Sequence, residues 1–568
     1  MKASETSLRN LLEGTKQFQI PLFQRPYSWT EDKWETLWED LMKLYNDEVE
    51  GSYFLGAIVT QSIAGTADGI SPYLVIDGQQ RLITLTILLA ALWDHLKREK
   101  KTELAPELYN LYLINQYKKG EEFYKILPTQ EDREAYQTIL QDKKTKKEVS
   151  PKKDQIYASY TFFKKQLKKP NKDEDFTLDI AKFKAVILER LILVSITSDD
   201  KDNPYLIFES LNYKGQELTQ ADLVRNYIFM QLPRERQEEI YKNKWLPLQD
   251  KFKANMAPKE YAGELTTAFW FYLRKDGRSV GEKEVYKEIK NIFDRAKNDS
   301  ELKLEELVQF ANYYQCLKFD NNEPQVSLQS WFKRLLRLDF TTCHIFLLNV
   351  YYDYEHQKLS IENFEKILRY LESYFVRRWF ANVSTRSLGN VFNNLYGEVK
   401  EANPDDLVEG LRKVLGGYEK NKRWPSDEEF RQGILNTSVY ASKGSNDRVK
   451  LILESLTDSL SKEQVNKQNL TIEHIIPQTS KLNSQWKSML GANYADVQKK
   501  FLHTLGNLTL TGYNTEIGDK PFDEKKSFYL QSNVSLNKYF QDITIWNTDA
   551  IKKRAENLAD IAIQVWPR

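Results

Sequence analysis

Residues 471–478 read TIEHIIPQ, and residues 503–511 read HTLGNLTLT. The chain has five histidines, and two of them, His474 and His503, fall in these short stretches. An imidazole can take a proton from water, and the glutamate before His474 offers oxygen ligands that suit a hard divalent cation. Together with Asn514, the two stretches therefore indicate a site for metal-assisted hydrolysis.

The order and spacing of these residues are those that an HNH (ββα-metal) phosphodiesterase needs. We expect His474, at the end of the first strand, to be the general base. Glu473 and Asn514 are the expected ligands of Mg²⁺ or Mn²⁺, and such an ion keeps several waters. Asn507 is expected to orient the histidine or tether the loop.

Two further side chains complete the expected site. His503 is a second candidate, as a contact to phosphate, and Lys525 or Lys526 is expected to neutralise charge on the scissile phosphate. The alternative is that a histidine beside a glutamate is only a surface or core pair. Pro477, which closes the first strand, and Gly506, which permits a tight turn, favour the site.

The same residues resemble a known family. Residues 473–478, 505–510 and 522–526, with Asn514, resemble the C-terminal HNH domain of GmrSD-type, modification-dependent (type IV) restriction endonucleases. That family has an asparagine where many HNH enzymes have their last histidine. The opening of the domain resembles 424–430, and the resemblance covers about residues 420–568.

A second signature, Asp77-Gly78-Gln79-Gln80-Arg81, lies near the other end of the chain. The segment 73–76 before it is typical of a strand, and a long apolar helix is expected from Leu82. At such a strand-to-helix turn, backbone N–H groups and the helix terminus favour an anion. Arg81 is expected to contact phosphate, Gly78 to allow close approach of the backbone, and Asp77 to position water or a metal. The chain has no Gly-x-x-x-x-Gly-Lys-Ser/Thr loop, so it is not a P-loop NTPase.

This signature also belongs to a resemblance. Residues 23–29, 53–56 and 75–85 look like the N-terminal half of the same family, which is similar to the ParB/sulfiredoxin fold, and 208–212 and 222–226 match its second block. The resemblance implies binding and hydrolysis of an NTP (GTP, UTP, CTP or ATP) and a part in sensing modified DNA. The residues it implies for the nucleotide are Gln24, Arg25, Asp77, Gly78, Gln79, Gln80, Arg81, Thr84, Asn212, Arg225 and Asn226.

Composition sets wider limits. A chain of 568 residues with 41% hydrophobic residues is expected to form two to four domains. Two cysteines suit a reducing cytosol, the N-terminus has no apolar signal segment, and no stretch spans a membrane, so we expect a cytoplasmic protein. A net charge of +1 neither supports nor excludes binding to nucleic acid.

Periodicity indicates the remaining elements. An amphipathic helix is expected over 34–45, strands over 53–60 and 191–197, and a helix over 204–211 followed by a turn at 212–215. Thr219 is expected to cap another helix, and long helices to fill 236–420. The aromatic residues Tyr27, Trp29, Trp34 and Trp38 are expected in the core rather than stacked on a flipped base.

We therefore predict an α+β, predominantly helical protein with three parts. These are a ParB/sulfiredoxin-like domain over 1–235, a helical region over 236–420 and an HNH domain over 421–568. Both halves in one chain resemble the fused forms of the family, including SspE and BrxU.

The predicted function is anti-phage defence, as a nucleotide-regulated, metal-dependent nuclease that cleaves or nicks double-stranded DNA with a foreign modification. One alternative is an SspE-like nicking NTPase that senses phosphorothioates. Others are a nucleotide-switched DNA-binding regulator with an inactive HNH site and an RNA-cleaving toxin. A homodimer is expected, since dimers are the commonest soluble assembly.

Overall fold

The structure is a computed structural model that describes residues 2–63, 69–99, 103–141, 154–168, 178–198, 218–257, 260–296, 299–319, 322–440, 445–461, 463 and 465–568. The chain forms two compact units. Unit 1 comprises Met1–Pro247 and Lys290–Glu301, and unit 2 comprises Leu248–Ile289 and Leu302–Arg568. The fold is α+β and predominantly helical, as predicted. No helix in the described part of the chain is long and apolar enough to cross a membrane.

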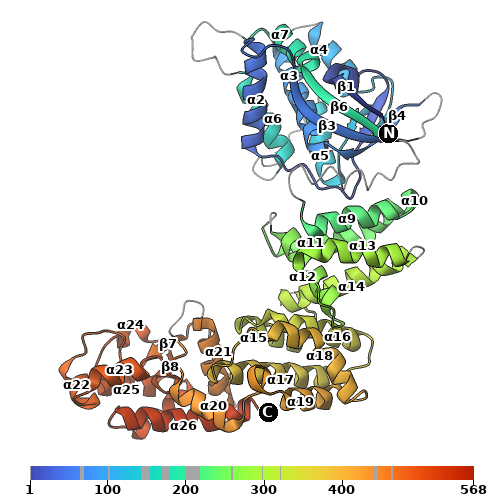
Figure 1. The fold of residues 1–568 in the computed structure, drawn as a ribbon. Helices are drawn as coiled ribbons and strands as arrows, with labels where there is room; N and C mark the ends of the chain where they lie inside the picture. The colour runs from blue at the N-terminus through green and yellow to red at the C-terminus, as the bar shows by residue number, and fades with distance from the viewer. Residues whose placement is uncertain are drawn as a thin grey trace. The chain divides into compact units, whose positions relative to one another are not determined.

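Unit 1 is built on a mixed sheet (Figure 1). Its strand order is β1-β6-β3-β4-β2-β5. The strands are β1 (Lys2–Ser7), β2 (Lys16–Gln19), β3 (Tyr53–Ser62), β4 (Ser71–Asp77), β5 (Ile126–Leu127) and β6 (Leu191–Ser198). The predicted strands at 53–60, 73–76 and 191–197 are confirmed as β3, β4 and β6. Strands β1, β2 and β5 were not among the predicted strands.

The core of unit 1 centres on helix α3 (Gln79–Arg98), which is apolar on nearly all sides and almost entirely buried. The helix was expected from Leu82 but begins at Gln79, because Gly78, at φ +88°, takes the N-cap position. Helix α2 (Glu31–Tyr45) confirms the expected amphipathic helix. The expected core aromatics, Tyr27 and Trp34, are buried there, and Trp29 and Trp38 pack against it.

The second block of unit 1 is described only from residue 218 onward. The helix expected over 204–211 and the turn at 212–215 lie outside the described residues. Helix α9 (Gln220–Gln231) is confirmed, with Thr219 as its cap: the Asp222 backbone N–H donates to Thr219 Oγ1 at 3.2 Å. The other helices of the first 250 residues are α1 (Leu8–Leu12), α4 (Leu104–Leu108), α5 (Gln130–Leu140), α6 (Gln155–Gln166), α7 (Ile180–Ala185) and α10 (Arg234–Ile240).

The helical region expected over 236–420 is confirmed. Its helices after α10 are α11 (Leu246–Ala254), α12 (Tyr261–Arg274), α13 (Val285–Ala296), α14 (Ser300–Lys318), α15 (Val326–Arg337), α16 (His344–Glu355), α17 (Ile361–Phe380), α18 (Leu388–Ala402) and α19 (Leu407–Gly417).

The C-terminal part of unit 2 pairs two short strands, β7 (Thr471–His474) and β8 (Leu508–Thr511), and surrounds them with helices. The helices are α20 (Asp427–Asn436), α21 (Ser445–Ser459), α22 (Ser484–Leu490), α23 (Tyr494–Phe501), α24 (Asn514–Ile517), α25 (Phe522–Gln531) and α26 (Thr548–Val565).

Helix α17 makes hydrogen bonds to Trp566, near the C-terminus. The indole of Trp566, 1% exposed, donates to Glu372 Oε1 at 2.7 Å. The fully buried Arg377 donates to the carbonyls of Trp566 and Pro425 at 2.8 and 3.1 Å. The residues after 420 thus share a core with the helix before them.

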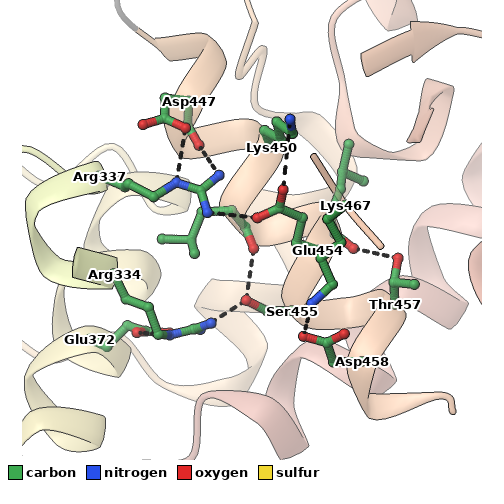
Figure 2. Close-up of polar contacts among 12 residues, drawn as sticks. Arg334, Arg337, Glu372, Asp447, Lys450, Glu454, Ser455, Thr457, Asp458 and Lys467 are labelled. Carbon is green, nitrogen blue, oxygen red and sulfur yellow. Dashed lines mark hydrogen bonds and ion pairs between the residues drawn. The ribbon is translucent and has the colours of Figure 1, made fainter. Parts of the chain in front are cut away.

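A polar network joins α15, α17 and α21 (Figure 2). Arg334 donates from Nε and Nη2 to both carboxylate oxygens of Glu372, at 2.8 and 2.6 Å, and Nη2 also donates to Ser455 Oγ at 2.8 Å. Arg337 pairs with Glu454 at 2.6 Å and Asp447 at 2.9 Å. Because α21 packs against β7 and β8, this network extends the helical region to the strand pair.

We predict that Trp566→Ala in the full chain lowers the stability of unit 2 by about 3–5 kcal/mol, because it removes a fully buried indole and leaves a cavity. Denaturant unfolding measures the change. Ile545→Ala, at a side chain that is 55% exposed, is the control and should shift the midpoint little. Equal midpoints for the two variants would show that the α17 contact adds no stability.

Candidate active site

The strand pair β7–β8 brings the two motif stretches together. The strands are antiparallel, with His474 opposite Leu508 and Glu473 opposite Thr509. Leu505–Asn507 forms a short 3₁₀ turn that leads into β8. An alanine Cβ at Gly506 would lie 2.7 Å from the carbonyl oxygen of Ile551 on α26. Glycine is therefore required there by close packing against α26.

The Asn507 side chain tethers the loop after β7. It is fully buried, and its Oδ1 accepts hydrogen bonds from Ile476 N at 2.9 Å and Trp546 Nε1 at 3.2 Å. Its Nδ2 donates to the carbonyl of Leu502 at 3.0 Å. It thus fixes the backbone two residues beyond His474, which matches the tethering that the sequence led us to expect.

The two motif histidines meet. His474 Nε2 and His503 Nδ1 are 3.1 Å apart, a hydrogen bond whose donor depends on the tautomers. The ring of Tyr440 lies edge-on to His474, with centroids 4.6 Å apart, and stacks on His503 at 5.7 Å. The backbone N–H of Val439 donates to the His503 carbonyl, so the segment before Tyr440 fixes His503 beside His474.

Both imidazoles are held neutral. Burial, with His503 and Lys525 adding to it, lowers the pKa of His474 to about 3. Burial also lowers the pKa of His503. At neutral pH His474 therefore lacks a proton on one ring nitrogen, which is the state that a general base needs.

Glu473 points away from His474, since consecutive strand residues face opposite sides. Its side chain is buried and accepts on Oε1 from Lys525 Nζ at 2.7 Å and Tyr529 OH at 3.2 Å. Burial raises the pKa of Glu473 and lowers that of Lys525, and their mutual attraction opposes both shifts. Lys525 is fully buried and also donates to the His474 carbonyl at 2.9 Å, so its observed contacts are internal.

Asn514 lies at the start of α24. Its Nδ2 donates to Thr471 Oγ1 at 2.8 Å and to the Ile472 carbonyl at 3.0 Å. Thr471 and Glu473 share a face of β7, which puts Asn514 on the Glu473 side of the strand. The side-chain amide nitrogen is used in both bonds, and Oδ1 is the atom that would bind a cation.

The donor set suits a hard cation that keeps most of its water. Glu473 and Asn514 offer oxygen atoms, which Mg²⁺ and Mn²⁺ prefer. No group of three or more His, Cys, Asp or Glu side chains within the described ranges is arranged to hold a metal. The residues fit a cation held by two protein ligands, and Lys525 would have to share or release Glu473.

The second motif forms the turn between β4 and α3 in unit 1. Gly78, at φ +88°, lies against Ala57 and Ile58, and an added Cβ would lie 2.7 Å from the Ala57 carbonyl oxygen. Arg81 donates from Nη2 to that carbonyl at 2.7 Å and to Asp77 Oδ2 at 3.4 Å. The Arg81 side chain is 26% exposed, so the pair faces solvent in part.

The glutamines of this block hold the 24–28 loop. Gln24 Nε2 donates to the carbonyls of Val75 and Ile76, at 2.9 and 3.1 Å. Gln80 accepts from Ser28 N at 2.8 Å, and Gln79 Nε2 donates to the Arg25 carbonyl at 3.4 Å. Thr84 Oγ1 is 2.7 Å from the buried hydroxyl of Tyr27. Each of these residues has a structural contact, and their roles in binding a nucleotide stay predictions.

Residues from the second block face the same turn. Arg225, 3% exposed, pairs with Asp222 at 2.8 Å and donates to the Phe23 carbonyl. Burial lowers the pKa of Arg25, Arg225 lowers it further, and Asp222 and Asp77 oppose the shift, so these charges lie close together. Asn226 is buried, and its Oδ1 has no hydrogen-bond partner in the part of the chain that the structure describes. Asn212 lies outside the described residues.

Comparison with known families now decides the family. Residues 8–229 match the N-terminal domain of the GmrSD restriction endonucleases, and residues 424–561 match their C-terminal domain. The chain belongs to the GmrSD restriction endonuclease family. The comparison with curated proteins finds no match.

Membership in the GmrSD family supports a DNA endonuclease of a restriction system. The N-terminal match contains the β4–α3 turn of unit 1, and the C-terminal match contains the β7–β8 site of unit 2. Which residues bind metal, nucleotide or DNA is not decided by the family and stays a prediction.

The motifs alone did not indicate three neighbours of these sites. Tyr440 packs on both histidines, Tyr529 donates to Glu473, and Arg554 donates to the carbonyls on both sides of Asn507. All three are more than 25 residues from the side chain that they contact, so no local spacing connects them. The residue type of Arg554 is the one available signal, because an arginine that becomes buried needs partners.

We predict that Lys525→Met lowers the stability of unit 2 by about 3–5 kcal/mol, because it leaves the Glu473 carboxylate buried without its cation. Adding Glu473→Gln should recover part of the loss. A double-mutant cycle of denaturant unfolding measures the coupling. If Lys525→Met keeps full stability but loses cleavage, the lysine serves DNA phosphate instead.

Proposed function

We propose that this chain is a divalent-metal-dependent restriction nuclease that hydrolyses phosphodiester bonds of modified double-stranded DNA at the His474 site. The observation that carries the proposal is the geometry of His474, which is buried and fixed between a tethered loop and a second histidine. A base needs this preorganisation, since misplacement by about 1 Å can cost about 10² in rate.

The side chains at this site have different roles in the proposed reaction. The unprotonated nitrogen of His474 takes the proton from the attacking water, and His503 and Tyr440 hold the imidazole in place. Asn507 keeps the loop after β7 from moving. Glu473 and Asn514 would hold Mg²⁺ or Mn²⁺, which when bound stabilises charge on the leaving oxygen.

For unit 1 we propose a nucleotide site at the β4–α3 turn. Arg25, Arg81 and Arg225 place guanidinium groups around a glycine turn at a helix N-terminus, and this is chemistry that suits phosphates. The site would bind and hydrolyse an NTP, and the bound nucleotide would regulate cleavage.

One observation favours a second candidate function, a DNA-binding regulator whose metal site is inactive. The ammonium of Lys525 already pairs with Glu473, in the place that a metal cation would take. Cleavage of phage-derived modified DNA with Mg²⁺ or Mn²⁺, against the same reaction with EDTA, separates the two. Binding without metal-dependent cleavage would favour the regulator.

We predict that His474→Ala lowers the cleavage rate by roughly 10²–10⁴-fold, since it removes the base. The substrate is modified DNA, compared with unmodified DNA and RNA. His356→Ala is the matched control, because His356 is an exposed histidine of the same unit.

In the same assay Asn514→Ala should raise the concentration of Mg²⁺ needed for half-maximal rate, with the fold kept. Cleavage by purified His474→Ala at the wild-type rate would contradict the assignment of the base.

We predict that Arg81→Ala abolishes nucleotide binding, because it removes the guanidinium beside the glycine turn. Calorimetry with GTP, UTP, CTP and ATP, each with Mg²⁺, measures it. Arg98→Ala, on the same helix, is the control. If the wild type binds none of the four, the turn is scaffold only.

A further inference from the structure

A pocket of about 280 Å³ lies behind the strand pair of unit 2, between α26 and the 3₁₀ turn Ser535–Asp542. Its polar lining comes from Ser535, Lys538, Tyr539, Arg554 and Asn557. Three of the five can donate hydrogen bonds from a hydroxyl or a guanidinium, and Lys538 adds a second cation. The lining contains no carboxylate.

Arg554 is fully buried and only partly satisfied. Its Nη1 donates to the carbonyls of Gly506 and Leu508, at 2.8 and 2.7 Å. Among the described residues, its Nε and Nη2 have no hydrogen-bond partner, and neither has the buried hydroxyl of Tyr539. Nε and Nη2 form one edge of the guanidinium, which is the two-pronged edge that binds an oxyanion in parallel hydrogen bonds.

The charge of Arg554 is also unbalanced. No ion pair of this guanidinium occurs among the residues that the structure describes. Burial lowers the pKa of Arg554 to about 10, and the groups that oppose the shift are the phenols of Tyr539 and Tyr529. The ring of Phe540, 5.0 Å from the guanidinium carbon, lends a cation–π contact but no hydrogen bond. A buried cation that lacks both a counter-ion and two hydrogen bonds is costly.

We propose that this pocket is a site for a small phosphate-bearing anion, held by the Nε–Nη2 edge of Arg554, the Tyr539 hydroxyl and Lys538. The volume lies just below the range of about 300–1,000 Å³ that is typical of drug-sized ligands, so it suits inorganic phosphate or a nucleoside monophosphate.

The site goes beyond the nuclease proposal, and it lies next to the loop that the proposal depends on. Gly506 and Leu508, whose carbonyls Arg554 holds, flank Asn507. An anion bound to Nε and Nη2 of Arg554 balances the charge of the guanidinium while Nη1 keeps its hydrogen bonds to the two carbonyls. Occupancy therefore stabilises the folded state that contains the Asn507 turn, by an amount that rises with the anion concentration relative to its Kd.

The test is calorimetry of inorganic phosphate and of a deoxynucleoside 5′-monophosphate with the full chain. The background is Arg81→Ala, the variant expected to abolish nucleotide binding in unit 1, so that the arginines of unit 1 do not dominate the signal. Tyr539→Phe removes one hydroxyl without changing the fold, and Lys538→Ala removes the rim cation. Lys553→Ala is the control, at an exposed position next to Arg554 and outside the pocket lining.

We expect phosphate to bind and to raise the melting temperature, with Tyr539→Phe weakening binding about tenfold and Lys538→Ala about two- to fivefold. Lys553→Ala should bind as the background does. The proposal is overturned if phosphate at about 10 mM, above a weak millimolar Kd, gives no heat and no shift. It is also overturned if Tyr539→Phe binds equally well, or if only a DNA duplex binds.

Discussion

The side chain of Asn507 is the constraint on which the arrangement of the candidate nuclease site depends. Three hydrogen bonds join it to Ile476, Trp546 and Leu502, which come from three different segments. A fully buried amide must satisfy its donors and acceptors, so these segments can pack in few other ways. Gly506, the residue before Asn507, allows α26 to approach closely. Arg554 of that helix donates hydrogen bonds to the carbonyls of Gly506 and Leu508, on either side of Asn507.

This arrangement divides the strand β7 into two faces with different chemistry. On one face His474 meets His503 and Tyr440, and its pKa is low because the site is buried and nearby groups are positive or neutral. On the other face Glu473 is paired with Lys525. One strand thus keeps the His474 imidazole apart from the Glu473 carboxylate, whose negative charge close by would raise the pKa of the imidazole.

The sequence predicted those structural features that depend on residues close together in the chain. The apolar helix after Gly78, the cap at Thr219 and the fold class follow from local patterns and are confirmed. Pairings between distant residues did not follow: Lys525 lies 52 residues from Glu473, and Arg554 lies 48 from Gly506. Periodicity has no information on such contacts, because tertiary packing selects them. The edge strand β1 was missed for the same reason, since its partner β6 begins almost 190 residues later.

Each candidate chemistry has its residues within one unit of the chain. The described arginines and the glycine turn proposed for a nucleotide lie in unit 1, and the two histidines with Asn507 lie in unit 2. As proposed, each site takes its residues from one unit alone. A nucleotide that influences cleavage must favour one of two states of the chain over the other, through a difference in affinity. Such linkage is reciprocal for binding: a nucleotide that strengthens DNA binding must itself be bound more tightly when DNA is present.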